Sequence, residues 1–97
     1  MADGFEWDTD KDAENRRKHG ITFEEAVAIW EGPVLTWHDD RFEYGETRET
    51  SIGMLGAAAV LTVSHTDRDG LRRIISARKA TKSERRDYHA YLERTLG

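Results

Sequence analysis

Residues 57–79 constrain the fold of this 97-residue chain more than any other segment. An almost continuous run of small apolar side chains over 57–66 is typical of a central strand that is covered on both faces. Asp69-Gly70 favours a hairpin turn, after which 71–79 returns as a second strand whose two isoleucines lie on opposite faces. An antiparallel pair of this kind requires further elements packed against it.

Capping signals predict helices before and after this hairpin. Asp8 or Asp10 can accept hydrogen bonds from the first amides of a helix, and Gly20 suits the left-handed residue that ends it. Thr22-x-x-Glu25 and Thr81-x-x-Glu84 are capping boxes that open a second and a last helix. An apolar stripe follows each box: Phe23, Ala26, Val27 and Trp30 in the second helix, and Tyr88, Tyr91, Leu92 and Leu96 in the last.

Shorter segments complete the expected order of elements. Strands are expected at 5–7, 34–37 and 47–54, and Gly32-Pro33 ends the second helix. The order predicts an α+β domain, in which an antiparallel sheet of about four strands is flanked by N-terminal helices and one C-terminal helix.

Composition limits the class of protein. The length and the 37% of hydrophobic residues predict one domain that spans residues 1–97. The chain lacks cysteine, which excludes a disulfide, a thiol nucleophile and a thiolate zinc site. No apolar run approaches the ~18 residues of a membrane span, and no basic-then-apolar leader opens the chain. We therefore expect a soluble, cytoplasmic protein without a membrane partner.

Charge is distributed unevenly along the chain. Residues 1–67 hold 6 basic and 15 acidic side chains, whereas residues 68–86 hold 8 basic and 2 acidic ones. The basic segment either neutralises the acidic remainder of the domain or supplies contacts to a polyanion. The acidic N-terminal part argues against a passive nucleic-acid coat protein, which is usually basic throughout.

The central strand ends at a histidine, and its neighbour carries cations. His65 shares the parity of Leu61 and Val63, so it is either a partly buried core residue or a general acid or base at the rim of the sheet. Arg78 on the next strand can hold a phosphate with two hydrogen bonds, and the pattern leaves open which face carries it. Further cations flank it: Arg68, Arg73, Lys79, Arg85 and Arg86.

Three other groups have a structural explanation beside a functional one. Glu84 and Tyr88 point the same way on the last helix, where the capping box and the apolar stripe account for them. Lys18 and His19 end the first helix, where the helix dipole favours cations. The run 38–40, His-Asp-Asp, could begin a metal site, but a solvated acidic loop explains it without one. We expect neither a metal site nor a cofactor.

Several short motifs together resemble the BrnT family of bacterial toxins from type II toxin–antitoxin systems. They follow in order over residues 5–88: Phe5-Glu6-Trp7-Asp8, Asn15 with Lys18-His19-Gly20, Phe23-Glu24-Glu25-Ala26, Gly45-Glu46-x-Arg48, His65-Thr66-x-Arg68, Arg73-Ile74-Ile75-Ser76-Ala77-Arg78-Lys79-Ala80, and Glu84-Arg85 with Tyr88. This family is similar to the RelE ribonucleases in fold, an antiparallel sheet flanked by helices. The resemblance therefore agrees with the order of elements derived above.

The resemblance implies an RNA-cleaving toxin that arrests growth by blocking translation. Its expected partners are RNA, including mRNA on the ribosome, and a BrnA-type antitoxin whose ribbon-helix-helix part binds DNA. Toxin and antitoxin would form a higher-order complex that represses their own operon.

The resemblance also implies metal-independent chemistry. RNA carries its own nucleophile, the 2′-hydroxyl, so in-line attack would give a 2′,3′-cyclic phosphate and a 5′-hydroxyl. Arg78, Arg48 and Lys79 would hold the phosphate, and His65 is the first choice for proton transfer. The expected catalytic residues are His65, Arg78, Glu84 and Tyr88, and the expected RNA contacts are Lys18, His19, Arg48, Arg68, Arg73 and Lys79.

Two other classes of function stay open. The basic 68–86 segment could serve a non-catalytic module that binds RNA or a protein. A DNA-binding regulator is the other class, but the second helix lacks the Arg/Asn/Gln-rich face of a major-groove reader. Operator binding is therefore expected of the antitoxin.

Overall fold

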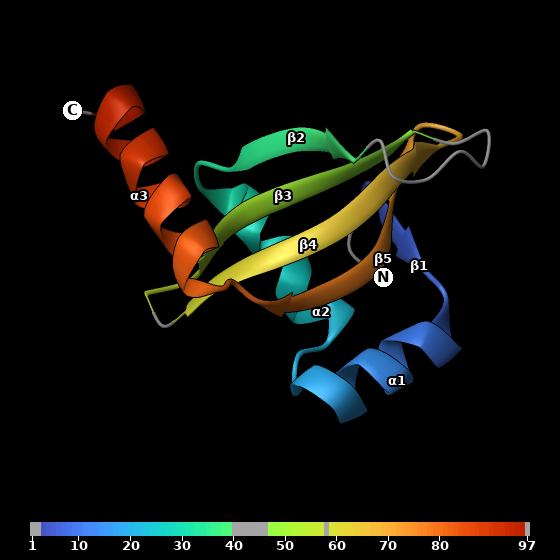
Figure 1. Cartoon of the computed structure of the whole chain (residues 1–97). Helices are drawn as coiled ribbons and strands as arrows, with labels where there is room; N and C mark the ends of the chain where they lie inside the picture. The colour runs from blue at the N-terminus through green and yellow to red at the C-terminus, as the bar shows by residue number, and fades with distance from the viewer. Residues whose placement is uncertain (1–2, 40–46, 58, 97) are drawn as a thin grey trace.

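The computed structural model describes residues 3–39, 47–57 and 59–96, and the fold is built on one five-stranded sheet (Figure 1). The strands are β1 (Phe5–Trp7), β2 (Leu35–Asp39), β3 (Arg48–Leu55), β4 (Ala59–Arg68) and β5 (Leu71–Lys79), in the spatial order β1-β5-β4-β3-β2. Every pairing is antiparallel except that of β1, which adds to β5 as a parallel edge strand. The predicted α+β class is confirmed, and β1 extends the expected four strands to five.

The helices are α1 (Thr9–His19), α2 (Phe23–Ala26), the 3₁₀ helix η1 (Val27–Glu31) and α3 (Lys82–Leu96). Asp8 caps α1 by accepting hydrogen bonds from two backbone amides, and Gly20 ends it with a left-handed φ of 70°. Both capping boxes form, because Thr22 and Glu25 bond each other's backbone amides, as do Thr81 and Glu84. The predicted helix boundaries are confirmed at these caps.

The second helix departs from its predicted apolar stripe. It is α-helical only over α2 and continues as η1, and the residues that it buries completely are Phe23, Ala26 and Ile29. Their spacing of three follows the three residues per turn of a 3₁₀ helix, whereas the α-helical pattern had selected Trp30. Gly53 lets η1 approach β3 closely, since a Cβ atom on Gly53 would lie 2.8 Å from the Cβ of Ile29.

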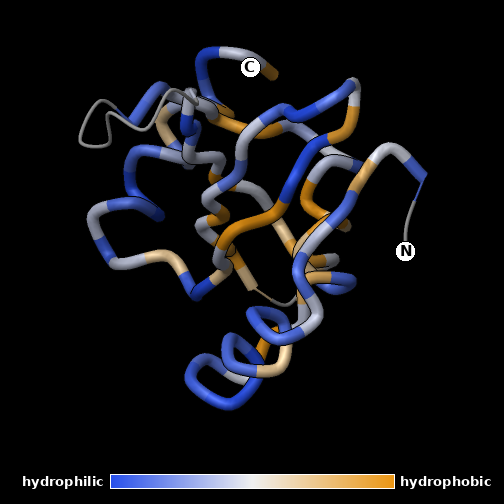
Figure 2. The backbone as a smooth tube through the Cα atoms, turned by 90° about the vertical axis from the view of Figure 1, so that its right-hand side faces the viewer, coloured by the Kyte–Doolittle hydropathy of each residue, from blue (hydrophilic) through white to orange (hydrophobic). Residues whose placement is uncertain are grey.

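The main core lies between the sheet and the N-terminal helices. In Figure 1, α1 and α2 lie below the sheet, while α3 rises at its left end. Leu61 and Val63 of β4 and Ile74 and Ala77 of β5 pack there with Phe23. Figure 2 shows hydrophobic segments along the middle of the molecule, whereas α1 at the bottom is mostly hydrophilic. In the part of the chain described, no helix is long and apolar enough to cross a membrane.

The polar side chain of Asn15 attaches the hydrophilic α1 to the sheet. Its Nδ2 donates to the carbonyl oxygens of Ala77, at 2.8 Å, and of Ile21, at 2.9 Å. Its Oδ1 accepts the amide of Ala77 at 3.1 Å. Since β1 pairs with β5 only over residues 72–74, the Asn15 amide bonds the edge of β5 beyond the end of β1.

Candidate active site

An irregularity in β5 decides which face of the sheet carries Arg78. Ser64 of β4 pairs with Ser76, but the next residue, His65, pairs with Ile74, so Ile75 is an extra residue in β5. Arg78 pairs with Thr62 and therefore lies on the face of Thr62 and Ser64, away from the main core. The face that the sequence left open is thus the one opposite α1 and α2.

Glu84 holds the guanidinium of Arg78 in a bidentate ion pair. The two Nη–Oε distances are 2.7 and 2.9 Å, and Glu84 Oε1 also accepts from Thr62 Oγ1 at 3.1 Å and from the amide of Thr81 at 2.8 Å. The Arg78 hydrogen bond, followed by those from Thr81 and Thr62, lowers the pKa of Glu84 to about 2. Glu84 is therefore ionised at neutral pH, and its carboxylate fixes the guanidinium in position.

Arg78 and Glu84 line a pocket of about 260 Å³, which we call the arginine pocket. Its other lining residues are Trp37 and Asp39 of β2, Thr50 of β3 and Ser64 of β4. The Arg78 side chain remains 42% exposed despite its ion pair. A guanidinium that is held in place, accessible, and surrounded by hydroxyl groups is suited to binding a phosphate and stabilising negative charge on it.

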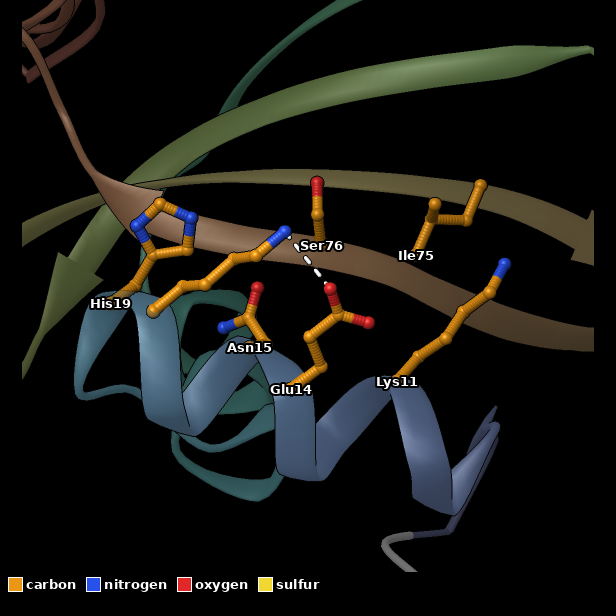
Figure 3. A pocket seen from close by; sticks show the side chains of 7 residues that line it. Lys11, Glu14, Asn15, His19, Ile75 and Ser76 are labelled. Carbon is orange, nitrogen blue, oxygen red and sulfur yellow. Dashed lines mark ion pairs between the residues drawn. The ribbon is translucent and has the colours of Figure 1, made fainter.

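A second hollow of about 240 Å³, the α1 cleft, brings Lys18 and His19 beside β5 (Figure 3). Side chains of α1 rise toward β5, and Lys18 Nζ lies 2.9 Å from Glu14 Oε1. Ser76, which lines this cleft, is the register partner of Ser64, which lines the arginine pocket. Each hollow therefore has one lining residue in this pair of neighbouring strand positions.

His65 lies in the core and does not meet Arg78. It is 1% exposed, its Nε2 lies 2.7 Å from Ser51 Oγ, and its ring packs edge-on against Trp30 at 5.0 Å. Burial, and then the charge of Arg72, lower the pKa of His65 to about 4, so the imidazole is neutral. The interpretation of His65 as a core residue fits these contacts, and the expected grouping of a histidine with the strand cations does not form.

Tyr88 anchors α3 rather than lining the arginine pocket. The residue is 1% exposed, and its hydroxyl donates to the carbonyl oxygen of Pro33 at 2.7 Å. Burial raises the pKa of this hydroxyl. The predicted apolar stripe is less buried toward the end of α3, where Leu96 is 68% exposed. Tyr88 thus connects the last helix to the segment that precedes β2.

The remaining expected cations are distributed over both faces. Arg48 pairs in register with Asp39 and Thr66, on the face of Arg78. Arg73 lies on the same face, 3.6 Å from Glu6.

Other cations lie farther from the arginine pocket. Lys79 follows Arg78 directly and so points away from it, and it lines a separate pocket of about 350 Å³ with Arg85 and His89 of α3. Arg68 is exposed at the end of β4. Lys79 and Arg68 therefore do not join Arg78.

The residues 38–40, suggested above as the beginning of a metal site, do not group together where the structure describes them. His38 and Asp39 are consecutive in β2 and so point to opposite faces, and Asp40 lies outside the described residues. Gly45 and Glu46 of the family motif also lie outside them. Over the described ranges, no three His, Asp or Glu side chains come together in a way that could hold a metal ion.

Sequence reasoning named Arg78 and Glu84 but missed the other residues of the arginine pocket, among which Trp37 is the largest. Its indole is 41% exposed on β2, and its register partner is Thr50. An aromatic residue in a short strand next to an acidic loop is the only signal that the sequence offers. That signal becomes informative only when the face of Arg78 is known.

Comparisons with known proteins bear on the family and the fold. The family described as "Ribonuclease toxin, BrnT, of type II toxin-antitoxin system" matches residues 7–84. No curated protein matches the chain. The crystal structure of the Brucella abortus ribonuclease toxin BrnT is similar in fold, with a TM-score of 0.58 and 22% identity over 78% of this chain and 94% of that one. The chain thus belongs to the BrnT family of ribonuclease toxins of type II toxin–antitoxin systems.

Proposed function

We propose that this chain cleaves RNA in the arginine pocket, without a metal ion, by attack of the 2′-hydroxyl on the adjacent phosphate. The observation that carries the proposal is the Arg78–Glu84 ion pair, which fixes an accessible guanidinium among hydroxyl groups. The O2′–P bond forms as the P–O5′ bond breaks, and the leaving 5′-oxygen takes a proton from water, so the products are a 2′,3′-cyclic phosphate and a 5′-hydroxyl. RNA supplies its own nucleophile, so the protein has to align the strand and stabilise charge.

Arg78 binds the phosphate and stabilises the negative charge that accumulates on it in the transition state. A guanidinium can donate two parallel hydrogen bonds to phosphate oxygens, and it remains protonated at any pH at which RNA is stable. Glu84 is a positioning residue, because its carboxylate already accepts four hydrogen bonds and its pKa of about 2 makes it a weak base. Loss of Glu84 would leave the guanidinium without its fixed orientation.

Proton removal from the 2′-hydroxyl falls to Asp39 in this proposal. The ionisable side chains that line the arginine pocket, among the described residues, are Asp39, Arg78 and Glu84. Glu84 has a pKa of about 2 and is therefore a weak base, and the buried His65 and Tyr88 do not line the arginine pocket. A positioned general base contributes typically ~10²–10⁴ in rate, so we expect a loss of that order in the Asp39→Asn variant.

The α1 cleft extends the proposed RNA surface beyond the arginine pocket. Ser64 of the arginine pocket and Ser76 of the α1 cleft are neighbours in register, so an RNA strand bound at Arg78 would continue across β5 toward Lys18 and His19. Arg48 and Arg73 add positive charge on the same face of the sheet. Contacts of this kind bind the phosphate backbone with little dependence on sequence.

The proposal includes growth arrest through cleavage of mRNA, free or on the ribosome, and neutralisation by a BrnA-type antitoxin. An acidic segment of the antitoxin laid over the arginine pocket would exclude RNA by charge and by bulk. The ribbon-helix-helix part of that partner would bring the toxin to the operator in a higher-order complex. This part rests on family membership.

The test combines induced expression in bacteria with cleavage by purified protein in the presence of EDTA. Wild type should arrest growth and leave RNA fragments that end in 2′,3′-cyclic phosphate, and Arg78→Ala should relieve both effects. Arg85→Ala is the matched control, because it removes a charge from the same basic segment but lines the other pocket. Intact RNA and normal growth with folded wild-type protein would instead favour a non-catalytic binding module on the 68–86 face.

A further inference from the structure

Trp37 forms an aromatic wall of the arginine pocket. The indole is 41% exposed, whereas Trp7 is 9% exposed in the main core. The register partners of Trp37 along the sheet are Thr50 and then Ser64, which have short polar side chains. The surface between the indole and Arg78 therefore consists of short side chains. It extends from β2 to β5, which are three strand spacings apart, about 14 Å.

We propose that Trp37 stacks on an unpaired base of the bound RNA, next to the phosphate that Arg78 holds. This inference rests on the proposed function and deepens it, since it names single-stranded RNA as the substrate class. Every nucleobase has a flat π-face, so stacking on an indole tolerates any sequence. A base in a duplex is already stacked between its neighbours and is not available to Trp37.

The chemistry of the pocket favours a nucleotide over an apolar side chain of a protein partner. Apart from the indole, the described lining consists of Asp39, Thr50, Ser64, Arg78 and Glu84, all of them polar or charged. An apolar side chain that packed on Trp37 would desolvate these groups without bonding them. A nucleotide carries a flat ring and an anionic group together, and so matches both walls of the pocket.

Binding of short 2′-O-methyl oligoribonucleotides, followed by fluorescence anisotropy, tests the inference. These probes lack the nucleophile, so they stay intact during the measurement. We expect Trp37→Ala to weaken binding of a single strand on the order of tenfold and Trp37→Phe to retain most of it. Met54→Ala is the matched control, because Met54 is 37% exposed but lines the other pocket. Thermal unfolding confirms that each variant is folded.

Abasic substitutions identify stacking directly. An oligonucleotide that lacks one base at the position facing Trp37 should bind wild type about as weakly as Trp37→Ala binds the complete strand. The two losses should not add when variant and abasic probe are combined, because they remove the same contact. A set of probes, each with the gap at a different position, locates this base.

Two results overturn the inference while leaving the proposed function intact. In one, wild type binds and cleaves RNA and Trp37→Ala does both equally well. In the other, the losses from the variant and from every abasic probe simply add. If folded wild type neither binds nor cleaves any RNA, the proposed function fails, and the inference fails with it.

Discussion

His65 and Arg78 lie on opposite faces of the sheet, although their strands are hydrogen-bonded neighbours. The imidazole bonds Ser51, which in turn lies 2.7 Å from Thr36, while the guanidinium bonds Glu84 on the other side. These two residues therefore belong to different parts of the molecule, one to its stability and one to its proposed chemistry. Substitutions should separate the two contributions.

His65→Ala should destabilise the fold and leave cleavage per folded molecule nearly unchanged. The substitution leaves a cavity beside Trp30 and removes the partner of Ser51 in a dry environment. We expect a loss of about 2–4 kcal/mol in the free energy of unfolding, by analogy with other large-to-small core substitutions. Urea denaturation measures this loss. A fall in kcat of more than about tenfold in fully folded protein would instead place His65 in the mechanism.

Stability should fall as the pH is lowered from about 6.5 to about 4. Burial and the charge of Arg72 lower the pKa of His65 from 6.5 to about 4, so the unfolded chain takes up a proton in this range and the folded protein does not. The contribution of His65 to the free energy of unfolding is fully present above pH 6.5, and on the order of 3 kcal/mol of it is lost by pH 4. Glu84 adds a loss of stability at lower pH, because its pKa is 4.5 in the unfolded chain and about 2 in the folded protein.

Urea unfolding of wild type and His65→Gln, at about pH 7 and about pH 5, checks this expectation. The glutamine can still bond Ser51 but does not titrate, so its stability should change little between the two conditions. Equal losses in both proteins would assign the pH dependence to other groups.

Glu84→Gln should reduce kcat more than it reduces RNA affinity. The amide keeps the size of the side chain but loses the charge that holds both nitrogens of Arg78. Misplacement of a catalytic group costs on the order of 10²-fold in rate, whereas phosphate binding needs less precise alignment. Single-turnover cleavage and binding of an uncleavable strand give the two quantities.

The pH dependence of cleavage separates positioning by Glu84 from acid–base catalysis. Because the pKa of Glu84 is about 2, the pH–rate profile near neutrality should keep its shape in Glu84→Gln and only shift downward. A limb of the profile that disappears in this variant would show that Glu84 itself exchanges the proton.

Asn15→Ala should loosen the attachment of α1 to β5. The substitution leaves the amide and the carbonyl of Ala77 without the partners that Asn15 provides in a buried place. Each such loss costs about 1–3 kcal/mol, and two of them on one side chain should be measurable by thermal unfolding. Amide exchange at Ala77 should become faster, with exchange in the β3–β4 hairpin unaffected.

The sequence predicts elements best where the signal is local. The caps at Asp8, Thr22 and Thr81 each depend on a side chain and a backbone group within a few residues, and Gly20 ends α1 with a left-handed φ, so all four could be predicted from the local sequence. The hairpin at 69–70 is equally local, and Gly70 has the expected positive φ of 80°.

The candidate site was harder to predict because it depends on register. Alternation along β5 cannot assign the face of Arg78, since the extra residue Ile75 shifts the pattern between Ile74 and Ala77. The close packing of Ile29 in η1 against Gly53 of β3 likewise involves residues far apart in the sequence. Arg78, Glu84, Trp37 and Asp39 come together only once the sheet is assembled, so the sequence named the first two as site residues and missed the other two.

The amide of Asn15 also bears on how the protein avoids association with its own copies. An open edge strand is a template to which another chain can add, and natural sheets protect such edges. Beyond residue 74, β5 would present backbone groups in this way, but Asn15 bonds both the donor and the acceptor of Ala77. The Asn15 side chain thus takes the hydrogen bonds that a neighbouring strand would make at Ala77. Another chain therefore finds no free backbone group at this residue.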